Sequence, residues 1–168
     1  MTPTTEVSNT WGDGTLVQVE TETFRINIPN NWNPVNPGDI PTPRQWELAF
    51  ASTSVNERNG YFNNIVVIQD INRLNENSLA LMNNTLNTIK NTMLQFQLIM
   101  DKEIIFTDKT EGKVIVFQWK YSAQTPILNY IQTSKNCWDI SYFLTISTAW
   151  EIEGYERYFP ILESFTCK

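Results

Sequence analysis

The chain has 168 residues, which is enough for one domain with one hydrophobic core. Its net charge is −6 and it contains no histidine. The negative charge argues against a nucleic-acid partner and against attachment to anionic lipid, because both need clustered lysine and arginine. Without histidine, Ser-His-Asp and Cys-His nucleophiles are excluded, and no cofactor or metal site is predicted. No apolar run reaches the length of a transmembrane helix, so no transmembrane segment is predicted.

The N-terminal region is rich in Thr, Ser, Asn and Gly. We expect residues 1–21 to form a flexible leader or linker and residues 22–168 to form a single domain. No charged segment followed by an apolar one occurs near residue 1, so no signal segment is predicted within this chain. If residue 1 is not the native start, a signal segment or lipid anchor would lie upstream.

Alternating apolar residues predict strands before residue 60. Phe24, Ile26 and Ile28 share one face, and Pro29 ends the strand because proline has no N–H to donate. A stretch rich in proline then predicts an extended loop over residues 33–43. Residues 45–52, with Trp46 near their start, predict another strand.

The rest of the chain is organised around residues 60–94. The β-branched run from Ile65 to Ile68 predicts a central strand. A helix is predicted from about Ser78 to Leu94, because apolar residues recur there at helical spacing and Asn77 or Ser78 can cap its start. That apolar stripe is read as core packing, with a partner-binding groove as the alternative; it comprises Leu79, Met82, Leu86, Ile89 and Met93.

Two hairpins and a helix are predicted after residue 95. The first hairpin turns at residues 108–113, with Val114 and Val116 on one face and Ile115, Phe117, Trp119 and Tyr121 on the other. The second joins strands at 127–133 and 138–147 through a turn at 134–136. Residues 152–165 show helical spacing, with a kink or restarted turn expected near Tyr158 because Pro160 follows. Hairpins and helices in this order predict an α+β fold with an antiparallel sheet.

Several of these segments together resemble the PsbP-like family. They are Phe24–Pro29 followed by Trp32, the strand at 62–67 before the long helix, the strand at 142–147, and the ending at 158–165 with its Ser-Phe pair. The resemblance implies an α/β/α sandwich in which helices flank an antiparallel sheet. The family includes photosystem extrinsic subunits, a Ran-binding relative and bacterial secreted or lipid-anchored proteins, and no shared catalytic residues define it. It therefore implies a scaffold or binding module.

Cys137 and Cys167 are the two cysteines. A disulfide between them in an oxidising compartment is one interpretation, and two buried thiols in a cytosolic protein is the other. Five tryptophans are interpreted as core, with a ligand pocket as the alternative: Trp32, Trp46, Trp119, Trp138 and Trp150. If one face of the sheet is open, Trp119 and Tyr121 are the residues expected to mark a partner surface, with Trp46 as a further candidate.

The function expected from these observations is that of a non-enzymatic, extracytoplasmic module, periplasmic or at the cell surface, that binds a protein partner. The alternative is a small-ligand carrier with an aromatic-lined cleft between sheet and helix. A carboxylate-based hydrolase would need two carboxylates that converge in one cleft. The sequence contains no pair of Asp or Glu residues that predicts such an arrangement.

Overall fold

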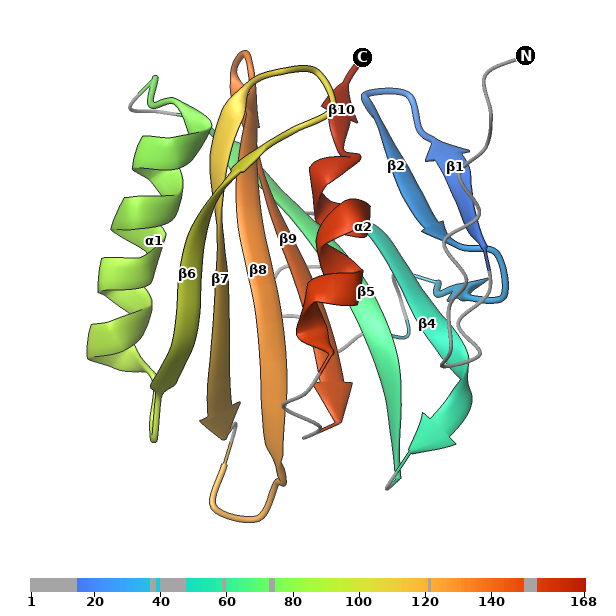
Figure 1. Ribbon diagram of the computed structural model, residues 1–168, viewed down its shortest axis with the longest axis vertical. Helices are drawn as coiled ribbons and strands as arrows, with labels where there is room; N and C mark the ends of the chain where they lie inside the picture. Colours follow the sequence, from blue (N-terminus) through green and yellow to red (C-terminus); the bar gives the residue numbers. More distant parts are fainter. Residues whose placement is uncertain are drawn as a thin grey trace.

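The structure is a computed structural model that describes residues 15–36, 39, 48–58, 60–72, 75–120, 122–149 and 154–168. The side chains of residues 56–58 lie outside that description. Within these ranges the chain forms five strands, a long helix, four strands, a short helical segment and a final strand (Figure 1). This order agrees with the predicted one except for the last strand and for a short strand at Asn33–Pro34, which lies in the predicted loop.

Within the described residues the strands form two antiparallel sheets. The larger sheet has the order β3-β4-β5-β9-β8-β7-β6, and the smaller one has the order β1-β2-β10. In chain order the strands are β1 (Leu16–Glu20), β2 (Phe24–Pro29), β3 (Asn33–Pro34), β4 (Leu48–Arg58), β5 (Tyr61–Ile71), β6 (Gln97–Ile105), β7 (Glu111–Lys120), β8 (Ile127–Cys137), β9 (Ile140–Ala149) and β10 (Thr166–Cys167).

The long helix α1 (Ser78–Thr92) packs against one face of the large sheet, which we call the outer face. The side chain of Asn77 caps its start by accepting a hydrogen bond from the Ala80 amide at 2.8 Å. The predicted stripe faces the sheet, with Met82, Leu86 and Ile89 buried against Ile115 and Phe117 of β7. The opposite side of the helix is exposed and rich in asparagine, so the stripe is core, as predicted.

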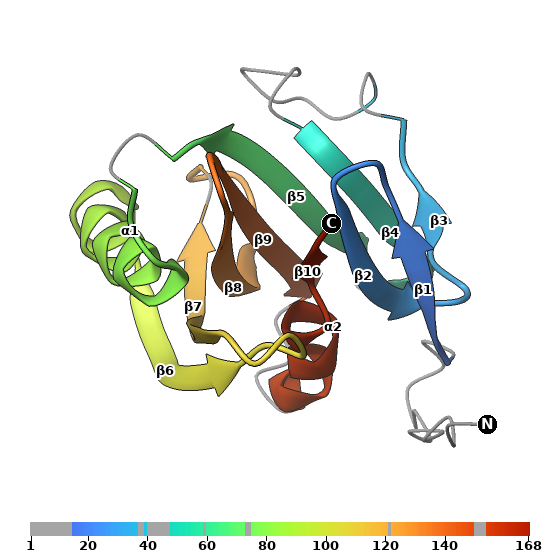
Figure 2. The same ribbon diagram turned by 90° about the horizontal axis from the view of Figure 1, so that it is seen from above.

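The inner face of the large sheet is covered by the small sheet together with α2 (Phe159–Glu163). Figure 2 shows α1 and α2 on opposite sides of the curled large sheet. Val114 and Val116 belong to this inner core, whereas Ile115 and Phe117 face α1, which confirms the predicted alternation along β7. The inner core includes the stacked rings of Phe24 and Phe165, whose centroids are 4.7 Å apart.

The C-terminal segment divides as the position of Pro160 predicts. A 3₁₀ turn (Tyr155–Tyr158) leads into α2, whose first turn contains the proline. Proline is tolerated there because the first amides of a helix have no intrahelical partner. The strand β10 follows and pairs with β2. Leu16–Glu20, which lies in the predicted leader, is also paired with β2, and the division into leader and domain stays a prediction.

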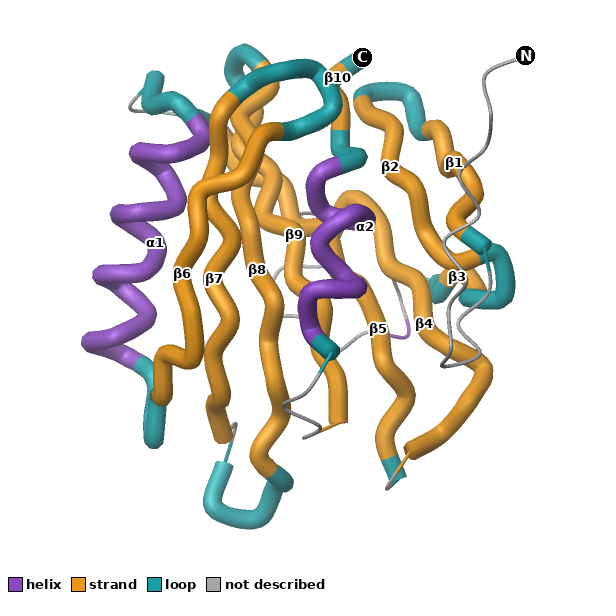
Figure 3. Tube along the Cα trace, in the orientation of Figure 1, coloured by secondary structure: helices purple, strands orange, loops and turns teal. Residues whose placement is uncertain are grey.

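The turn predicted at residues 134–136 is wrong. β8 continues to Cys137, and the hairpin turns at Trp138 and Asp139 (Figure 3). Ser and Asn favour turns locally, but here alternation along the strand brings Lys135 and Cys137 to the inner face. Both find partners there, since Lys135 pairs with Asp108 and Cys137 forms a disulfide. These contacts outweigh the local preference.

Candidate interaction surface

Aromatic rings gather on the outer face of the large sheet beside α1. Phe117 and Tyr130 stack with their ring centroids 5.3 Å apart, and Trp119 lies 5.7 Å from Tyr130. Trp119 and Tyr130 are partly buried at the margin of the α1 core. Across β9, Tyr130 lies in register with Asn64, whose amide donates to the Tyr61 hydroxyl at 2.9 Å. We call Trp119, Tyr130, Tyr61 and Phe62 the aromatic strip.

The phenol of Tyr130 is the most perturbed group of this strip. Its burial, with a smaller contribution from neighbouring Tyr61, raises the pKa of Tyr130 to about 12. Burial disfavours the charged phenolate, which is the form that must be solvated.

Tyr130 is therefore expected to ionise well above the ordinary pKa of a tyrosine. An ultraviolet difference titration of the native protein should show a late tyrosine step near pH 12 that the Tyr130→Phe variant lacks. Because the folded pKa exceeds the unfolded value of about 10, this group should lower stability as the pH rises above 10. A titration in which Tyr130→Phe loses an early step instead would contradict the placement.

The strip leads to an apolar groove of about 390 Å³ over β4 and β5. Phe62, at its edge, is 44% exposed. None of the described residues that line the groove has a charged side chain; they are Val35, Ala51, Ser52, Thr53, Gly60, Tyr61, Phe62, Asn64, Ile65 and Val66. Contiguous exposed apolar surfaces of this kind are typical of binding sites.

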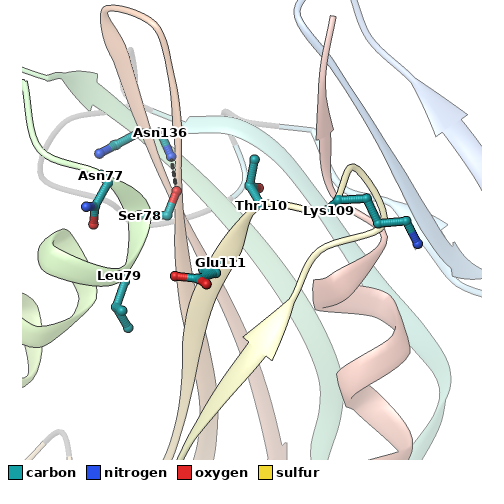
Figure 4. Close-up of a pocket in the computed structure, with 7 residues that line it drawn as sticks. All are labelled: Asn77, Ser78, Leu79, Lys109, Thr110, Glu111 and Asn136. Carbon is teal, nitrogen blue, oxygen red and sulfur yellow. Dashed lines mark hydrogen bonds between the residues drawn. The ribbon is translucent and has the colours of Figure 1, made fainter.

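A second pocket, of about 460 Å³, lies at the start of α1 (Figure 4). Its lining is mainly polar: Asn77, Ser78, Leu79, Lys109, Thr110, Glu111 and Asn136. Much of this hydrogen-bonding capacity is already used, since Ser78 accepts from the Asn136 amide at 2.9 Å and Asn77 caps the helix. Figure 4 shows the Lys109 ammonium pointing away from the pocket. The lining therefore favours neither an anion nor a cation.

The structure places some of the predicted site residues, while their role in binding stays a prediction. Trp119 lies on the outer face next to Tyr130, as the alternation along β7 predicts. Tyr121 and Trp46 lie outside the described residues, so their part in a surface stays a prediction. Cys137 and Cys167 form a disulfide, with their Cα atoms 5.6 Å apart. The sequence reasoning missed Tyr130 and Phe62, although the alternation in their strands was available as a signal.

Among the described residues, no three His, Cys, Asp or Glu side chains come together in a way that could hold a metal ion. The interface between α1 and the sheet is filled by apolar side chains, including Met82 and Phe117. In the same part of the chain, no helix is both long and apolar enough to cross a membrane.

The antiparallel sheet with helices packed on it defines a PsbP-like fold, as the sequence resemblance predicted. CyanoP, the PsbP of the cyanobacterium Synechocystis, superposes with a TM-score of 0.58 at 13% identity, covering 95% of this chain and 96% of that one. The Ran-binding protein Mog1p of Saccharomyces cerevisiae gives a TM-score of 0.59 at 7% identity, covering 91% and 95%.

A Pseudomonas aeruginosa protein of unknown function is also similar, with a TM-score of 0.55 at 11% identity and coverages of 89% and 92%. No family model and no curated protein sequence matches the chain. At these identities the comparisons establish the fold.

Proposed function

We propose that the chain is a non-enzymatic, extracytoplasmic module that binds a protein partner through the groove over β4 and β5 and the adjoining aromatic strip. The observation that carries this proposal is the groove with the exposed Phe62 in its lining, whose described side chains are all uncharged. Aromatic residues are enriched at the centres of protein interfaces, where their large rings are desolvated on binding.

The extracytoplasmic location is supported by the disulfide, because such bonds persist in oxidising compartments. In this proposal residues 1–21 tether a domain of the α/β/α type, as in secreted or lipid-anchored bacterial proteins. Mog1p, which shares the fold, is a Ran-binding protein, so this fold is compatible with binding a protein partner. The small-ligand alternative is less well supported, because apolar side chains fill the space between α1 and the sheet.

Site-specific photo-crosslinking in cells of the source organism tests the proposal. A photoreactive phenylalanine analogue at Phe62 should give one reproducible crosslinked protein, because that side chain lies at the edge of the groove. Val17 on β1 is the matched control, since it is 43% exposed and Phe62 is 44% exposed. The same analogue at Val17 should not capture that protein.

A charge placed in the groove provides the second control. Val66→Asp should abolish the crosslink from Phe62, because Val66 lines the groove and a buried carboxylate there would be unpaired. Equal capture from positions 17 and 62, or capture that persists in Val66→Asp, would contradict the proposed surface.

A further inference from the structure

The tip of the β8–β9 hairpin carries an exposed tryptophan in an unfavourable backbone conformation. Cys137 pairs with Ile140, so Trp138 and Asp139 form a two-residue loop. Trp138 has φ = 55° and is 71% exposed. Two-residue hairpin loops need positive φ at their first position, where glycine or asparagine is preferred. A bulky side chain in that region is an outlier.

Neither the backbone conformation of this position nor packing into the core explains why the residue is a tryptophan. Glycine would adopt the conformation without steric strain. The indole gains little from burial, because most of its surface is in solvent. Strained residues of this kind concentrate at binding sites, where the surrounding structure holds them.

The surrounding structure holds this tip firmly. Cys137, directly before Trp138, is bonded to Cys167. The Asn72 amide donates to the Asp139 carbonyl at 2.7 Å, and its side chain donates to the Trp138 carbonyl at 3.4 Å. A rigid tip loses little conformational entropy when it binds, which favours affinity.

The tip is apolar at its centre and acidic at its margin. Ile71, which is 63% exposed, pairs across the sheet with Ile140. Asp139 is exposed in the loop itself, and Glu76 follows in the adjoining loop. Asp70 is also exposed at this end of β5, but it pairs with Ser141 and so lies on the other face of the sheet from Ile71 and Ile140. By sequence that loop adds one cation, Arg73, against these three carboxylates.

Two described lysines near the tip are paired elsewhere and do not offset this negative charge. Lys135 is buried and paired with Asp108 at 2.6 Å. Lys168, next to Cys167, pairs with Glu20 at 2.6 Å. The tip therefore presents an indole and an isoleucine among carboxylates.

We propose that this tip, formed by Trp138, Ile71 and Ile140 with Asp70 and Asp139, binds a basic segment of a protein partner that carries apolar side chains. One lysine or arginine of the segment would meet Asp139 and the face of the indole, which attracts cations. A second would meet Asp70 at the end of β5. An apolar side chain would cover Ile71. The acidic margin disfavours anionic membranes. This surface is distinct from the groove of the proposed function.

A defined peptide probe tests this proposal on the full chain. The protein is labelled with 5-fluorotryptophan, and the Trp138 resonance is assigned by its loss in Trp138→Phe. A heptapeptide of alternating lysine and leucine should shift that resonance more than those of the other five of the six tryptophans. Binding should weaken with added salt, because the charge pairs are exposed. Peptides of glutamate and leucine, or of lysine and serine, should bind much more weakly.

Trp138→Gly separates binding from folding. It should reduce peptide affinity about tenfold or more, as for an interface hot spot. It should also raise the melting temperature by about 2–4 °C, because glycine relieves the strained φ. Asp70→Asn with Asp139→Asn should remove most of the salt dependence.

Other outcomes would overturn the proposal. These are uniform shifts of all tryptophan resonances, binding that survives in Trp138→Gly, or a Trp138 shift produced by phosphatidylcholine vesicles, which would make the tip a membrane contact. Phe62→Ser should leave peptide binding unchanged. A failure at the tip is thus distinguishable from a failure at the groove, which the crosslinking experiment tests separately.

Discussion

Replacing Cys137 and Cys167 together by serine is expected to lower the free energy of unfolding by about 3–4 kcal/mol. The two residues are 30 positions apart, and cross-linking a loop of that length restricts the unfolded chain by about this amount. For a chain of this size the melting temperature should fall by about 10 °C. Thermal unfolding followed by circular dichroism, with and without reductant, measures the effect.

The disulfide also holds particular strands together, so the structure predicts which strands open first when the disulfide is removed. It joins the end of β8 to β10, and β10 contacts β2 through two residue pairs. Behind β10 lie the buried rings of Phe24, Tyr142 and Phe165. Hydrogen exchange should therefore increase first in β10 and β2 when the bridge is removed.

Reduced wild-type protein should melt close to the double serine variant, and reductant should not affect that variant. If wild-type protein melts at the same temperature with and without reductant, although thiol titration shows that the bridge has been reduced, the stabilising role of the bridge is contradicted. Thiol trapping in intact cells addresses the compartment, because an extracytoplasmic protein should have no free thiol at these positions.

Asp108→Asn is expected to destabilise the protein by about 2–3 kcal/mol. The Asp108 carboxylate lies 2.6 Å from the ammonium of Lys135, whose side chain is 2% exposed. Thr110 accepts a further hydrogen bond from this ammonium, which lies 4.2 Å from the centre of the Phe106 ring. Removing the carboxylate would leave a buried charge without its counter-ion, which is more harmful than losing an exposed pair. Urea denaturation of both proteins measures the difference.

Asp101→Asn, on the same β6–β7 hairpin, is the matched control. Asp101 lies 3.6 Å from Lys113 and its side chain is 47% exposed, so solvent screens the pair. Its loss should change the free energy of unfolding by less than about 1 kcal/mol. Equal effects of the two substitutions would show that burial does not strengthen the Lys135 pair.

The effect of Asp108→Asn should depend on pH. Burial opposes ionisation of Asp108, but hydrogen bonds from Lys135 and Thr110, with the Lys135 charge, hold the pKa of Asp108 below its ordinary value. Because the folded pKa is the lower one, the stabilisation is complete above the unfolded pKa of about 4 and is lost as pH falls through the folded pKa. The stability difference between the two proteins should therefore shrink below pH 4.

The second hairpin shows where sequence reasoning fails. Ser134 and Asn136 are turn-forming residues, and the lysine between them is of a type that is rarely buried without a partner. Its partner, Asp108, is 27 positions away in the β6–β7 loop. Nothing in the local sequence reports that pairing. The true turn contains Trp138, which propensity alone assigns to a strand.

The sequence by itself determined the elements whose signal is periodic. The stripe from Leu79 to Met93 specifies α1, the alternation along β7 specifies which side chains meet α1, and Pro160 specifies the break near Tyr158. These patterns repeat every few residues, so they can be recognised in a short segment of the sequence. The cysteine pair was also visible, but not whether it is joined.

Only the tertiary structure decided the partners of Lys135 and Cys137, and with them the exposure of Trp138. Those contacts join residues about 30 positions apart, and their free energy exceeds the local preferences that a sequence displays. The groove beside Phe62 likewise arises because β4 and β5 lie outside the area that α1 covers on β7 and β8. The part of a sheet that a helix covers is set by packing between segments distant in the sequence. No periodicity in the sequence specifies that position.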